Sequence, residues 1–227
     1  MWTMVRAAGN AAAPDRAEAL EQLCRAYWYP LYAFLRRRGT DADQAADLVQ
    51  GLFAELLERD DLDGLSPEGG RFRGYLLGAL KHHTSNERRR ANALKRGGGV
   101  ALISIDAAEA EQRYRVEPVD EDSPERLFER RWALTLLERA MERLGAEQEA
   151  KGRSDVFAEL RGHLAGEPKG SHESAAQALG LTTGAVKVAV HRLKARYREL
   201  LREEVQHTVE DDLDPDQELR ELVQALG

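Results

Sequence analysis

Residues 171–201, SHESAAQALGLTTGAVKVAVHRLKARYRELL, constrain the fold of this chain more than any other stretch. Ala176 is small enough for two helices to approach closely, Gly180 permits a tight turn, and Thr182 can cap a second helix. The pattern therefore predicts a helix-turn-helix. The apolar positions expected to form its small core are Leu179, Leu181, Val186, Val190 and Leu193.

The second helix of this pair would present a basic and polar face outward, where a recognition helix meets the major groove. Lys187 and Arg192 can reach phosphate or guanine, and Val188 can touch a thymine methyl group. A plain helical hairpin with a solvated basic face is the alternative. The candidate DNA-contacting residues are Thr183, Gly184, Lys187, Val188, His191 and Arg192.

The net charge of −7 is a sum over segments of opposite sign. Eight basic residues against one acid give residues 71–96 a charge of +7, and six against two give residues 171–202 a charge of +4. Residues 104–127 carry −5 and residues 203–227 carry −8. The overall acidity excludes a uniformly basic coat, but the two basic segments predict separate phosphate-binding surfaces.

Helical periodicity organises the N-terminal part of the chain. It predicts one helix from Pro14 to near Gly39, a second capped by Asp41 and ending near Asp60, and a third from Phe72 to Gly97. The third helix begins with charged and aromatic side chains in alternation, a combination that stacks unpaired bases while neutralising phosphates. Phe72 itself is expected in the core.

The fold class expected from these patterns is all-α, with two small helical domains, at 1–96 and 123–204, and no strands. Residues 97–122, glycine-led and acidic, predict a flexible linker between them. The C-terminal extension 205–227 predicts an acidic amphipathic helix that either packs on the second domain or shields a basic patch. Its apolar stripe would be Leu219, Leu222, Val223 and Leu226.

No constellation in the sequence has the spacing of a catalytic or metal site, so we expect neither an enzyme nor a cofactor or metal. The single cysteine, Cys24, lies on an apolar helical stripe and is expected in the core. Neither a signal peptide nor a membrane-spanning apolar run is recognisable, which predicts a cytoplasmic protein without membrane insertion.

Three stretches together resemble the extracytoplasmic-function (ECF) group of the sigma-70 family of bacterial RNA polymerase sigma factors. WYPLYAFLRRRG with QAADLVQGLFAELL resembles the helix that docks on the β′ clamp of RNA polymerase, and FRGYLLGALKHHTSNERRR resembles the helix that reads and opens the −10 promoter element. LGLTTGAVKVAVHRLKARY resembles the helix-turn-helix that reads the −35 element. The resemblance implies a sigma region 2-like and a region 4-like domain.

The resemblance implies that the chain directs core RNA polymerase to promoter DNA, with contacts to the β′ clamp and β flap. An anti-sigma factor or a Ser/Thr kinase is a further partner it suggests. The residues implied for polymerase binding are Asp43, Asp47, Gln50 and Ala54. Those implied for the −10 element are Arg71, Arg73, Tyr75, Lys81, His82, Asn86, Arg89 and Arg90, with the loop 61–70 as a pocket for a flipped base.

The sequence departs from the family pattern at two acidic positions of the polymerase-binding motif, where Gln44 and Ala46 stand. This departure predicts weak intrinsic affinity for core polymerase, with phosphorylation of Thr40 as a way to supply the missing charge. Two other functions stay open on the residues alone: a stand-alone helix-turn-helix regulator and a helical protein-interaction module.

Overall fold

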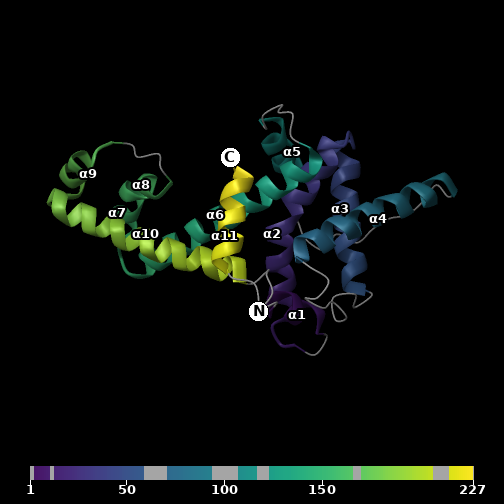
Figure 1. Ribbon diagram of the computed structural model, residues 1–227, viewed down its shortest axis with the longest axis horizontal. Helices are drawn as coiled ribbons and strands as arrows, with labels where there is room; N and C mark the ends of the chain where they lie inside the picture. Colours follow the sequence, from purple (N-terminus) through teal and green to yellow (C-terminus); the bar gives the residue numbers. More distant parts are fainter. Residues whose placement is uncertain are drawn as a thin grey trace. The chain divides into compact units, whose positions relative to one another are not determined.

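The computed structural model describes residues 3–10, 13–58, 71–93, 107–116, 123–165, 170–206 and 215–226. Every regular element in these ranges is an α-helix (Figure 1), which confirms the all-α prediction. The chain forms two compact units, one of residues 1–135 and 205–227 and one of residues 136–204. Long helices α6 and α10 each contribute to both units.

The first unit is built on the helix α2, with other helices packed against it. Aromatic residues dominate its core: Tyr27, Tyr32 and Phe34 on α2 are fully buried, and Tyr27 meets Phe72 of α4 edge to face at 5.5 Å. The helices of this unit are α1 (Thr3–Gly9), α2 (Arg16–Arg37), α3 (Ala42–Glu58), α4 (Phe72–Ala93), α5 (Ala107–Arg115), the first turns of α6 (Pro124–Ala150), and α11 (Pro215–Leu226).

The turn between α2 and α3 forms as the sequence predicts. Gly39 has a φ of +83°, a conformation that favours glycine, so α2 stops there. The Asp41 side chain then accepts a hydrogen bond from the backbone N–H of Gln44 at 2.9 Å, which caps α3. Ser123 caps α6 in the same way, through the N–H of Arg126 at 3.2 Å.

Helix α5 lies inside the segment that the sequence predicted to be an aperiodic linker, and for residues 107–115 that prediction is wrong. Arg36 of α2 donates two hydrogen bonds to the Glu111 carboxylate, at 2.9 and 3.0 Å, and the Tyr32 hydroxyl donates a third at 2.7 Å. Charge pairing thus docks a helix whose own apolar pattern is weak. Residues 97–106 and 117–122 of the expected linker lie outside the described residues.

Docking of α5 should be acid-labile. The hydrogen bond from Arg36 holds the pKa of Glu111 below the ordinary value of 4.5. Since folding lowers this pKa, the carboxylate stabilises docking above the ordinary value, and its contribution is lost as the pH falls through the lowered pKa. Hydrogen exchange of residues 107–115, corrected for intrinsic rates, should show declining protection as the pH is lowered from neutral towards about 3.

A Glu111→Gln variant provides the control for this prediction. Its α5 amides should be less protected at neutral pH, and their protection should change much less over the same pH range. An unaltered pH profile in the variant would assign the acid sensitivity to other carboxylates.

The second unit contains the helix-turn-helix. Its helices are the remainder of α6, α7 (Ser154–Leu160), α8 (Gly162–Ala165), α9 (His172–Leu179) and α10 (Thr183–Gln206). The Ser171 hydroxyl caps α9, Gly180 ends it with a φ of +63°, and Thr182 accepts from the N–H of Ala185 at 3.1 Å to cap α10. Ala176 is buried at the helix contact, as expected.

The core of this unit differs from the prediction at one position. Val186, Val190 and Leu193 are buried, but Leu181 is 44% exposed. Leu181 lies in the turn directly after Gly180, where the chain reverses and the neighbouring residues are also exposed. The core is completed instead from other helices, by residues Ala140, Leu144 and Leu160.

Cys24 lies in the core of the first unit, as predicted. It is 3% exposed, and burial raises the pKa of its thiol to about 12.

Among the residues that the structure describes, none of the helices is long and apolar enough to cross a membrane.

Candidate nucleic-acid interface

The N-terminal half of α10 presents the side chains that the sequence assigned to a recognition helix. Gly184, Lys187, His191 and Arg192 are exposed, and Thr183 is half-buried at the first turn. Val188 is 50% exposed, although its neighbour Val186 is fully buried. An exposed valine beside basic residues can contact a thymine methyl group in the major groove of DNA, while the basic residues contact phosphates or guanine.

Ion pairs on the far half of α10 hold this helix against α6 within the second unit. Arg196 contacts Glu147 at 2.7 Å, and Arg139 contacts Glu204 at 2.9 Å. The Tyr197 hydroxyl donates to the backbone carbonyl of Leu137 at 3.1 Å. These contacts anchor α10 along its C-terminal half and leave its first turns exposed.

Helix α4 carries three of the proposed −10 residues in a hydrogen-bonded row. The Asn86 amide lies 3.2 Å from the Nδ1 atom of His82, and Arg89 donates to the Asn86 carbonyl at 2.7 Å. His82 and Arg89 are exposed. Arg90 belongs to α4, but its side chain lies outside the described part of the structure, as does the loop 61–70.

Tyr75 is half-buried and stacks on the ring of Phe72, with the ring centroids 6.1 Å apart. Phe72 is 1% exposed and belongs to the core, as the sequence predicted. The buried ring therefore supports a second, more accessible ring, whose outer edge is the part of this pair that can meet an unpaired base.

Arg73 does not lie on the open basic surface where the sequence placed it. It is 5% exposed, and its guanidinium lies 4.4 Å from the centre of the Trp132 ring. Its Nε atom donates to Glu129 at 2.7 Å, and its Nη1 atom donates to Glu218 of α11. Two carboxylates and an indole face from distant parts of the chain compensate the buried charge, which no local pattern around Arg73 could reveal.

Arg71 is also paired with α11. It contacts Glu218 at 3.2 Å and forms an ion pair with Glu221, while a third of its side chain stays exposed. The hydrogen bond between them raises the pKa of Arg71 and lowers the pKa of Glu221. Two of the predicted −10 cations are thus occupied by carboxylates of this chain's own C-terminal helix.

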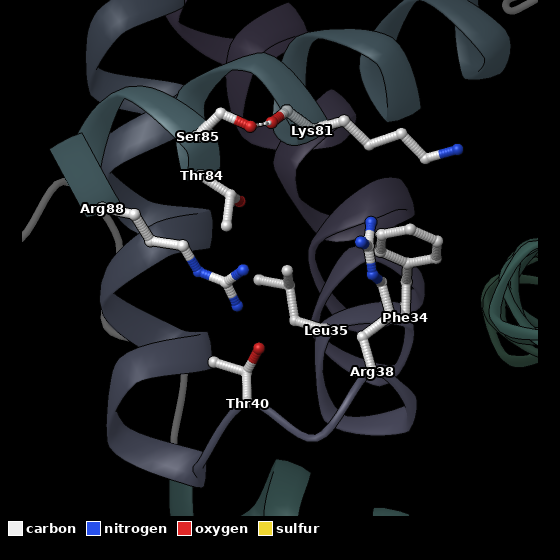
Figure 2. Close-up of a pocket in the computed structure, with 8 residues that line it drawn as sticks. All are labelled: Phe34, Leu35, Arg38, Thr40, Lys81, Thr84, Ser85 and Arg88. Carbon is white, nitrogen blue, oxygen red and sulfur yellow. Dashed lines mark hydrogen bonds between the residues drawn. The ribbon is translucent and has the colours of Figure 1, made fainter.

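Lys81 lies at a small pocket that gathers cations the sequence did not single out (Figure 2). Its ammonium pairs with Glu125 at 2.8 Å. Arg38, from the end of α2, lies over the Phe34 ring, and Arg88 of α4 extends its guanidinium toward Leu35 and Thr40 (Figure 2). The sequence could have pointed to Arg38, because it belongs to a run of three arginines directly before Gly39. The residues lining this pocket are Phe34, Leu35, Arg38, Thr40, Lys81, Thr84, Ser85 and Arg88.

The four residues that the sequence assigned to polymerase binding lie on α3. Asp43 and Asp47 are exposed, while Gln50 and Ala54 are half-buried. Ala46, which stands where the family pattern has an acid, is 7% exposed. Two exposed carboxylates, those of Asp43 and Asp47, therefore lie one turn apart on the first half of α3.

The sequence of this chain matches the model of one known protein family. The family described as ECF sigma factor matches residues 13–207, which include α2, α3 and α4 as well as the helix-turn-helix. Neither the curated proteins nor the solved structures yield a significant match. Family membership implies a non-catalytic regulator. The match spans both basic faces in one chain, and the chain therefore belongs to the ECF sigma factor family, whose role is to direct RNA polymerase to promoters at the start of transcription.

Proposed function

We propose that the exposed face of α10 reads the −35 element and that α4 binds the −10 element, while α3 docks on the β′ clamp of RNA polymerase. One observation carries this division: the basic residues of α10 and the row His82, Asn86 and Arg89 of α4 are surface side chains on separate units. A polymerase that holds both units on one promoter would add their affinities through a high effective concentration.

The pocket around Lys81 extends the −10 surface in this proposal. Arg38 and Arg88 add two cations beside Lys81. We assign them to phosphates of the promoter strand, where charge neutralisation contributes affinity without sequence preference. The remaining partners in the proposal are the β flap, for the second unit, and an anti-sigma factor or a Ser/Thr kinase. The proposed compartment is the cytoplasm, where polymerase acts.

Reconstitution with core polymerase tests the proposed function. The chain is added to core enzyme on fragmented genomic DNA, and the start sites of the resulting transcripts are mapped. Transcripts that require the chain and share two spaced upstream elements are expected. Binding of duplex DNA without polymerase, as a dimer on palindromes, would instead favour the stand-alone regulator. Failure to bind DNA under any condition would favour the interaction module.

The kinase in this proposal would act on Thr40, which is 5% exposed and lines the pocket of Figure 2. The turn between α2 and α3 must open for a kinase to reach it. A Thr40→Glu variant, which carries the negative charge permanently, should bind core polymerase severalfold more tightly than the original chain. Thr40→Gln is the uncharged control, and equal affinities for the two variants, measured by titration with labelled polymerase, would eliminate this mode of activation.

A further inference from the structure

The C-terminal helix α11 (yellow in Figure 1) places carboxylates on cations of the proposed −10 surface. Glu218 contacts both Arg71 and Arg73, and Glu221 contacts Arg71. A carboxylate on a guanidinium satisfies the same donors that a backbone phosphate would use. The two glutamates therefore occupy positions that nucleic-acid phosphates would otherwise take.

Ion pairs of Glu218 and Glu221 hold α11 in place. Glu218 is 2% exposed, whereas Val223, on the stripe that the sequence predicted to pack, is 65% exposed. The apolar-stripe prediction is thus wrong for Val223. A helix of twelve residues is marginal without tertiary contacts. A competing polyanion can replace these ion pairs, because it makes the same kind of contact with the guanidiniums.

We propose that α11 is a built-in competitor of nucleic acid, whose Glu218 and Glu221 occupy the guanidinium of Arg71, directly before α4, until a phosphate of promoter DNA displaces them. The proposal rests on the proposed −10 role of α4 and adds its regulation. It also specifies the docked partner that the sequence left open: the tail shields a basic patch of the first unit.

The charges of the cluster show what displacement would change. With α11 docked, the two guanidiniums of Arg71 and Arg73 face three carboxylates, those of Glu129, Glu218 and Glu221. Without α11 only Glu129 remains. Arg73 keeps this partner and the Trp132 ring, so it stays held inside the unit, while Arg71, already 33% exposed, becomes available to phosphate.

Two variants remove the competitor in different ways. One chain ends at His207, where the family match also ends, and the other is the full-length Glu218→Gln/Glu221→Gln chain, which keeps the helix and loses its charge. A full-length Glu142→Gln/Glu149→Gln chain is the matched control, because it loses two exposed acids of α6 in the second unit. Each is titrated with a fluorescent single-stranded oligodeoxynucleotide at several salt concentrations, and anisotropy gives the affinity.

Both tail variants should bind the oligonucleotide about tenfold more tightly than the full chain at low salt. The apparent Kd scales inversely with the open fraction, and a tail docked in roughly nine chains of ten gives this factor. The slope of log K against log salt should steepen by about 0.7 for each additional phosphate that the opened surface neutralises. The control should match the unaltered chain.

Hydrogen exchange of α11 in the full chain tests competition directly. Its amides should lose protection when the oligonucleotide is added, and unchanged protection at saturating oligonucleotide would overturn the proposal. Equal affinities and salt slopes for all four chains would overturn it as well. In either case, promoter-dependent transcription by the full chain with core polymerase would show that the proposed function still holds. Loss of that transcription in every chain is the separate result that contradicts the function.

Discussion

Replacing Lys187 and Arg192 together by alanine should lower promoter-dependent transcription by roughly 30- to 1,000-fold. Both side chains are exposed on the first turns of α10, where neither helps to hold the fold. Each contact of this type to a base edge or phosphate contributes about 1–2 kcal/mol, and the two losses together correspond to that range. Run-off transcription from a mapped promoter, with saturating core polymerase, measures the effect.

The matched control removes the same charge from the same unit. Arg153 and Arg161 are exposed residues that flank α7 and do not belong to α10, and the Arg153→Ala/Arg161→Ala chain should transcribe within about twofold of the original. Affinity for core polymerase in the absence of DNA should be alike in all three chains. Equal loss of transcription in the control would indicate a general charge effect and would remove the −35 assignment from α10.

Substituting aspartate for one of two valines on α10 should unfold the second unit, whereas substituting it for the other should lower transcription and leave the fold intact. Val186 is fully buried with Val190 and Leu193, whereas Val188, two residues along, is 50% exposed. A carboxylate at position 186 has no partner in an apolar core and should cost about 4 kcal/mol or more, a large part of the stability of a small domain. Val186→Asp should therefore unfold the second unit.

Val188→Asp should keep the fold, with a change of about 0.5 kcal/mol or less in the free energy of unfolding, because the new charge is solvated. It should nevertheless reduce promoter-dependent transcription by at least about tenfold, since it adds a negative charge on the face proposed to meet DNA phosphates. Circular dichroism and thermal unfolding separate the two variants. A folded, fully active Val188→Asp chain would contradict the proposed orientation of α10.

Local signals were sufficient to predict the helices that build both proposed DNA-binding faces. The caps at Asp41 and Thr182 and the left-handed Gly180 are determined by neighbours within three or four residues, so the boundaries of α3, α9 and α10 follow from sequence alone. The exposed residues of the recognition helix follow from the same periodicity, because burial of Val186 and Val190 determines which side of α10 faces outward.

Contacts between distant parts of the chain account for what the sequence did not reveal. Arg73 and Glu218 are 145 positions apart, and Arg36 and Glu111 are 75 apart. A stretch of sequence as long as one helix contains only one member of each pair. From such a stretch Arg73 is predicted to be a surface cation, and residues 107–115 are predicted to be a linker. Helix α1 was missed for another reason: it is seven residues long, too short for a helical period to be recognised, and its described buried apolar side chains are Val5 and Ala8.

The buried thiol of Cys24 has a practical consequence for following these motions. It is the only cysteine of the chain, and its burial and its pKa of about 12 keep it in the unreactive thiol form at neutral pH. A cysteine introduced at an exposed position of α11, such as Val223→Cys, can therefore carry a fluorophore without first removing the native residue. Single-molecule fluorescence can then record when the tail leaves α4 as polymerase and promoter are added in turn.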